Sequence, residues 1–140
     1  MANVSVTQAN FRKGIFKNLR TALLNVHVDI GTNVYGSYPI KNISLPLLVI
    51  ENAQKLDTEK SVTGNLTYPG TAFVSIYTKQ AEKIDTYADA IEAALWAYES
   101  TFKTYNLFLK DIVDNDAVNY QDINGNKGHS KTISVMFEIL

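Results

Sequence analysis

The spacing of apolar residues near the start of the chain predicts an amphipathic helix. We expect it to begin at Thr7 or Asn10, either of which can cap the amino end, and to end at Asn25. Apolar side chains recur along it every three or four positions, which places them on one helix face. They are Phe11, Ile15, Leu19, Ala22 and Leu23.

A second helix is predicted to begin between Thr78 and Ala81 and to end near Ser100. Steps of four, three, four and three residues keep its apolar side chains on one face. Burial of each large member of this face contributes roughly 1.5–3 kcal/mol to folding. These residues are Ile84, Ala88, Ile91, Leu95 and Tyr98.

Elsewhere the apolar period falls to two, which predicts strands. Leu47 to Ile50 is an unbroken apolar run after Pro46, typical of a strand buried on both faces. Thr71 to Thr78 alternates, and Tyr68-Pro69-Gly70 before it has the chemistry of a turn. Further strands are expected at Val34-Tyr35, Leu107 to Val113, Ala117 to Asp122 and Lys131 to Leu140, the last two joined by a turn at Asn124-Gly125-Asn126 and Gly128.

The order of these elements predicts one α+β domain over residues 1–140. We expect a mostly antiparallel β-sheet of about four to six strands, with the two main helices packed on one face. The most polar connection, Gln54 to Asn65, is expected to form a mobile arm or a hairpin. It contains the charged residues Asp57, Glu59 and Lys60.

Composition narrows the class of protein. With 140 residues, 46% of them hydrophobic, and a net charge of −1, the chain is globular and is neither a polyanion nor basic overall. The absence of cysteine excludes disulfides, thiolate catalysis and cysteine-based zinc sites. The amino-terminal residues lack a signal-peptide pattern, and no apolar run approaches the roughly 20 residues of a membrane span. We therefore expect synthesis in a cytoplasm and no membrane partner.

The sequence offers little for catalysis. His27 and His129 have no second histidine three or four residues away, and Gly-x-Ser-x-Gly, Walker and dinucleotide patterns are absent. We expect His27 to interact with the end of the first helix and His129 to be solvated in a turn. We therefore expect a non-enzyme without catalytic, cofactor or metal residues. The enzymatic alternative is a small metal-dependent nuclease that uses Glu51 together with Asp57, Glu59 and Lys60.

The two predicted helices carry opposite charges away from their apolar faces. The basic residues of the first are Lys13, Lys17 and Arg20, and the acidic residues of the second are Glu82, Asp85, Asp89 and Glu92. Both sets suit a solvated helix face. The acidic set also suits contact with a basic neighbour, or the lining of a channel through which nucleic acid slides. Complementary charge on the two helices would suit a head-to-tail ring.

The pattern as a whole resembles the tail terminator, or tail completion, proteins of long-tailed bacteriophages, over nearly the full chain. The resemblance follows the order of elements and a few turn residues. After the first helix come Val34-Tyr35-Gly36 and Tyr38-Pro39, then Leu45 to Glu51, the polar arm, Ser75-Ile76-Tyr77 and the helix from Tyr87 to Leu95. An Asp122, Gly125 and His129 turn then leads into a terminal strand, Thr132 to Ile139.

This resemblance implies a structural virion protein at the head-proximal end of the tail. Family members form rings, commonly of six copies, that cap the tail tube and provide the joining surface for the DNA-filled head. The implied partners are copies of the chain itself, the tail tube protein and head–tail connector proteins, with DNA only as passing cargo. By position, Gln54 to Asn65 matches an arm that rearranges on assembly. The alternative within the same class is a head–tail connector or neck adaptor subunit.

Overall fold

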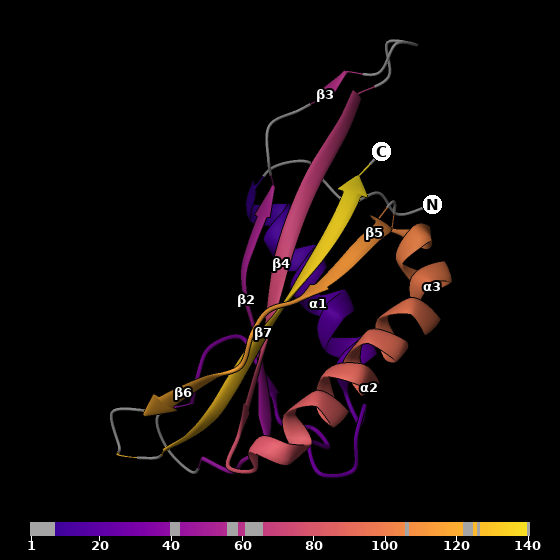
Figure 1. Cartoon of the computed structure of the whole chain (residues 1–140). Coiled ribbons are helices and arrows are strands. Elements are labelled where there is room, and N and C mark those ends of the chain that lie inside the picture. The colour runs from indigo at the N-terminus through magenta and orange to yellow at the C-terminus, as the bar shows by residue number, and fades with distance from the viewer. Residues whose placement is uncertain are drawn as a thin grey trace.

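A computed structural model describes residues 8–39, 43–55, 59–60, 66–105, 107–121, 125 and 127–139. Its helical elements are α1 (Gln8–Leu23), the short 3-10 helix η1 (Ala81–Lys83), α2 (Ile84–Ala97) and α3 (Glu99–Thr104). Its strands are β1 (Val34–Tyr35), β2 (Leu47–Lys55), β3 (Glu59–Lys60), β4 (Leu66–Thr78), β5 (Leu107–Asp114), β6 (Val118–Gln121) and β7 (Lys127–Ile139) (Figure 1).

The strands form one sheet in the order β1-β2-β4-β7-β5, with β3 paired to β4 and β6 paired to β7. Only the β1–β2 pair is parallel among the described strands. The longest ladder joins β4 to β7, from Tyr68 opposite Ile139 to Thr78 opposite His129. The predicted α+β class and mostly antiparallel sheet are confirmed, with six strands besides the two-residue β3.

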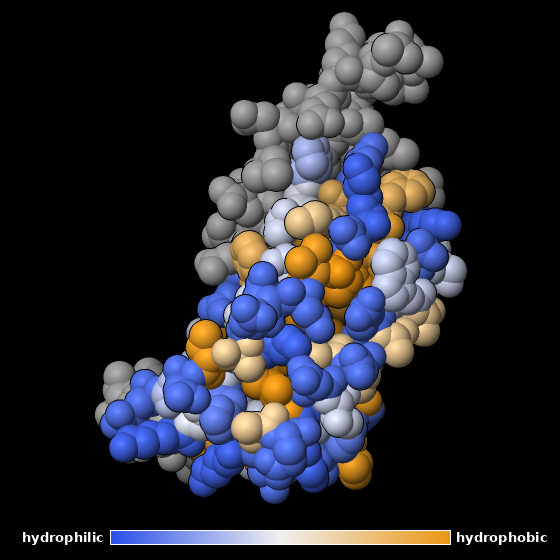
Figure 2. Space-filling model, in the orientation of Figure 1, coloured by the Kyte–Doolittle hydropathy of each residue, from blue (hydrophilic) through white to orange (hydrophobic). Residues whose placement is uncertain are grey.

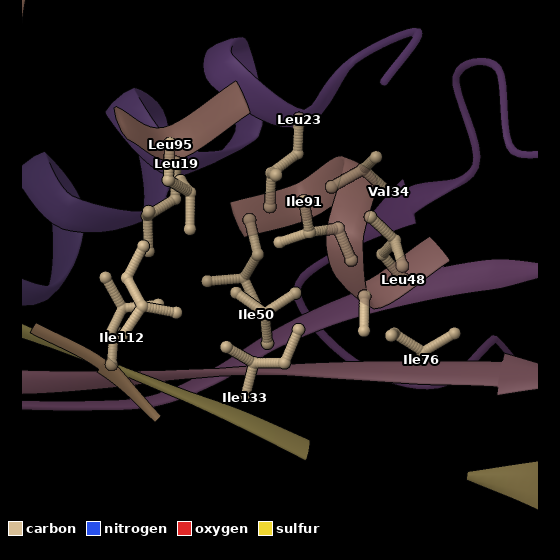
Figure 3. Packing of buried hydrophobic residues seen from close by; sticks show 14 of the residues in the cluster. Leu19, Leu23, Val34, Leu48, Ile50, Ile76, Ile91, Leu95, Ile112 and Ile133 are labelled. Carbon is tan, nitrogen blue, oxygen red and sulfur yellow. The ribbon is translucent and has the colours of Figure 1, made fainter. Parts of the chain in front are cut away.

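The helices pack on one face of the sheet, as predicted. Figure 3 shows Leu23 of α1 and Ile91 of α2 on the same side of the strands as Ile50 and Ile133. Phe102 of α3 joins this core through an edge-to-face contact with Phe137, at 5.2 Å between ring centroids. Alternation along each strand therefore sends one set of side chains to the helices and the other set to the opposite face, which we call the outer face.

The predicted arm is a strand extension where it is described. β2 continues to Lys55, and Leu66 and Thr67 of β4 pair with the two residues of β3. In Figure 1 this end of β4 and β3 extend beyond the end of β7. The prediction of a hairpin is thus confirmed for these residues, whereas Asp57 lies outside the described residues.

Several expected boundaries were wrong. Gly128 and His129, expected in a turn, lie in β7 and pair with Tyr120 and Asn119 of β6. Tyr68-Pro69-Gly70 lies inside β4 instead of forming a turn, because Pro69 is beyond the last β2 pair, Lys55 with Gly70, where a missing N–H is tolerated. The second predicted helix is interrupted at Tyr98, which has φ −89° and ψ 1°, and continues as α3. Phe102 extends its apolar face beyond the predicted end.

Candidate functional site

The outer face of the sheet is not covered by any described helix. Val113 of β5 and Met136 of β7 lie on this face, and each side chain remains 38% exposed. Figure 2 shows hydrophobic residues among hydrophilic ones over β5 and β7. Antiparallel sheets often present one face to solvent, but that face is normally polar. The apolar residues here mark the outer face as a candidate contact surface.

Polar side chains are fixed within the outer face beside this apolar area. Ser75, which is only 1% exposed, donates a 2.9 Å hydrogen bond to Oε1 of Glu51. Its hydroxyl also lies 3.1 Å from Oγ1 of Thr132 on β7. Glu51, part of the nuclease alternative, is therefore held within the sheet. The side chains of Glu59 and Lys60 lie outside the described part, so the proposed cluster stays a prediction.

A tyrosine cluster occupies the other end of the outer face. Tyr77 of β4 makes edge-to-face contacts with Tyr38 and with Tyr120 of β6, each at 4.9 Å between ring centroids. Leu47 and Val49 of β2 are buried at this end. Burial, followed by the charge of Glu51, raises the pKa of Tyr77. This end is therefore a second, smaller packed cluster and not an open surface.

The acidic residues predicted to share one side of the second helix differ in their contacts. Asp85 is bound within the molecule, because its Oδ1 lies 2.7 Å from Nζ of Lys131 on β7. Lys131 also approaches Oδ2 of Asp114 at 3.5 Å, and its hydrogen bond to Asp85 is the main cause of its raised pKa. Glu82 and Asp89 are exposed and Glu92 is half-buried, and they form no ion pair with another described residue.

The basic residues of α1 are also divided. Lys13 and Lys17 are exposed, whereas Arg20 is half-buried and its Nε donates a 3.2 Å hydrogen bond to the carbonyl of Val34. Arg20 therefore joins α1 to the edge strand β1. Only the two lysines remain available for a partner from this predicted set.

A polar cluster that the sequence analysis did not predict joins the loop after α1 to α2. Oδ2 of Asp29 accepts a 2.8 Å hydrogen bond from Tyr87 and lies 3.3 Å from Nζ of Lys83. The Tyr87 bond is the main cause of the lowered pKa of Asp29. Burial and the same bond raise the pKa of Tyr87 to about 12. His27 packs edge-to-face on Tyr87 at 4.9 Å, so its described ring contact is not with the end of α1 as expected.

Two open clefts lie near the η1 end of the molecule. The larger, about 600 Å³, is lined by Lys79, Asn119, Tyr120, Gln121, Lys127, Gly128 and His129. The smaller, about 400 Å³, lies beside Asp29 and Tyr87. In the described part of the chain, no group of three histidine or acidic residues is placed to hold a metal ion. No helix there is long and apolar enough to cross a membrane.

The chain brings together contact surfaces from residues that are distant in sequence. Neither a protein-family model nor a curated protein sequence matches it. The outer face, the arm and the exposed charges of α1 and α2 are therefore the features that support a function.

Proposed function

We propose that this chain is a structural subunit that forms a ring, caps a phage tail tube and provides the joining surface for the DNA-filled head. The observation that carries the proposal is the uncovered outer face with Val113 and Met136 exposed in it. An apolar area on an otherwise hydrogen-bonded sheet is suited to contact with another protein. The order of elements in the sequence supports the assignment to a tail terminator.

The arm supports the same proposal. Among the described residues, Leu66 and Thr67 pair with β3, and the last pair between β4 and β7 is Tyr68 with Ile139. Backbone groups at this end of the sheet can therefore pair with an added strand. Such pairing can join a subunit to its neighbour in a ring or to the tube protein.

Exposed charges provide a way to orient neighbouring subunits. Glu82 and Asp89 lie on the acidic side of the η1–α2 segment, and Lys13 and Lys17 on α1. Contact between unlike surfaces of adjacent copies produces a closed ring when the rotation closes. Exposed charges of this kind contribute more to orientation and association rate than to affinity.

The experiment is imaging and mass measurement of the purified full chain, alone and with the candidate tube protein. Rings of about six copies, free or on the ends of tubes, support the proposal. Rings of about twelve copies favour the head–tail connector alternative. A chain that stays monomeric with the tube protein and cleaves DNA with magnesium would overturn the proposal in favour of the nuclease.

A further inference from the structure

We propose that the cleft between β6, the start of β7 and Lys79 binds the phosphate backbone of nucleic acid. The cleft is lined by two lysines, a histidine and two side-chain amides, and no acidic residue is among its described lining. This inference stands whether or not the chain caps a tail.

The strand register explains why these groups share one surface. Asn119 lies opposite His129, and Gln121 lies opposite Lys127. Residues in register point to the same face of a sheet, and so do residues two apart on one strand. All four side chains therefore lie on one face of the β6–β7 pair. Lys79 directly follows β4. It lies beside the cleft because the preceding residue, Thr78, pairs with His129.

The cations of the cleft lack partners in the described part of the molecule. Lys131, Lys83 and Lys110 each form an ion pair with a described acid, whereas Lys79 and Lys127 do not. Both of these side chains are exposed. A cleft that collects unpaired cations is a favourable place for an anion.

The chemistry of the lining favours phosphate groups over acidic side chains of a protein. Lysine, asparagine and glutamine are typical donors to phosphate and sugar oxygens of nucleic acid. Lys127 and His129 are about 7 Å apart along β7, close to the rise of two phosphates on one strand of a duplex. The cleft is open, so a polymer can pass across it.

The test is binding of a short labelled DNA duplex to the full chain, followed by fluorescence anisotropy at about 50 and about 200 mM salt. We expect the double variant Lys79→Gln/Lys127→Gln to bind about tenfold more weakly for each lost contact at the lower salt. The slope of log affinity against log salt should fall by about two. Lys103→Gln is the matched control, because Lys103 is an exposed lysine on α3, at the other end of the molecule in Figure 1.

Four results would overturn the inference. The first is no DNA binding by the unaltered chain, and the second is a loss of DNA binding in Lys103→Gln equal to that in the double variant. The third is complete displacement of DNA by millimolar inorganic phosphate. The fourth is a double variant that no longer self-associates but binds DNA as the unaltered chain does. The third result would assign the cleft to a free phosphate compound, and the fourth to an acidic surface of a second copy. Circular dichroism and thermal unfolding confirm that each variant is folded. A single-stranded probe, run in parallel, shows which form of nucleic acid fits.

Discussion

The hydroxyl of Tyr87 in the first turn of α2 donates a 2.8 Å hydrogen bond to Oδ2 of Asp29 in the loop after α1. Tyr87 is otherwise buried, with 1% of its surface exposed, and Lys83 approaches the same carboxylate oxygen at 3.3 Å. The bond therefore fixes the loop against α2. It also links the folding equilibrium to pH through both groups.

This link predicts a loss of stability in alkali that depends on Tyr87. Its pKa is raised from 10.0 to about 12, so the unfolded chain loses this proton first as pH rises. The stability that Tyr87 contributes is present below pH 10 and is lost as pH rises from 10 to about 12. Tyr87→Phe should be less stable at neutral pH but should lose less stability in alkali. Urea unfolding at several pH values measures both, and parallel pH profiles would contradict the assignment.

Asp85 and Asp89 should respond differently to mutation. Asp85→Asn removes the negative charge that pairs with Lys131 and should lower the free energy of unfolding by about 0.5–1 kcal/mol, a small effect because Asp85 is 79% exposed. Asp89→Asn should change it by less than about 0.5 kcal/mol. Denaturant unfolding measures this difference.

Asp89→Lys is then the suitable test of charge in assembly, since a lysine at position 85 would repel Lys131 inside one molecule. We expect weaker ring formation at unchanged stability. Sedimentation measures the assembly. Normal assembly of Asp89→Lys would show that Asp89 does not lie in the contact between subunits.

Gly128 should not tolerate a side chain. A Cβ there would lie 2.5 Å from the carbonyl oxygen of Thr78 and 3.0 Å from a ring carbon of Tyr120. Because the first contact is with backbone, Gly128→Ala should cost about 1–3 kcal/mol in the free energy of unfolding. Gly125→Asn is the control, since Gly125 has φ +82°, a Cβ there would meet nothing within 4 Å, and asparagine tolerates positive φ. A similar effect of both changes would refute the steric explanation.

Met136→Lys should separate assembly from folding. Met136 is 38% exposed on the outer face, so the lysine can reach solvent in the monomer, and stability should change by less than about 0.5 kcal/mol. In a subunit contact the charge would be desolvated, and we expect the association constant to fall at least about tenfold. Val28→Lys, at a 91% exposed position in the loop after α1, is the matched control. Unchanged assembly in Met136→Lys would exclude this part of the outer face.

Local periodicity was sufficient to predict most of the fold. The apolar residues at helical spacing, including Ile91 and Leu95, predicted the buried face of α2. Residues at that spacing lie on one side of a helix, and an apolar side packs against the core. The run from Leu47 to Ile50 was expected to be buried on both faces, and all four side chains are buried. Leu47 and Val49, which point away from the helices, lie at the tyrosine end of the outer face and not under a second layer of helices.

Long-range polar contacts could not be predicted in the same way. Tyr38, Tyr77 and Tyr120 meet only after β6 pairs with β7, and no local pattern connects them. Lys131 belongs to an alternating strand, and nothing near it in sequence indicates Asp85 as its partner. Of the candidate charges, Asp85, Asp89 and Glu92 lie on α2 as expected, whereas Glu82 lies in η1. Which of these charges already have a partner within the molecule depends on the tertiary fold.

The position of β7 has a consequence for the synthesis of this protein. β7 lies between β4 and β5, and its ladder with β4 joins residues as far apart as Tyr68 and Ile139. Such distant pairing slows folding, since the intervening chain must be ordered before the ladder stabilises it. Because β7 follows β4 and β5 in the sequence, it is made after both of its neighbours. Nascent chains that stop short of residue 127 would leave β4 and β5 without the strand that pairs with both, and unpaired strand edges are prone to aggregate.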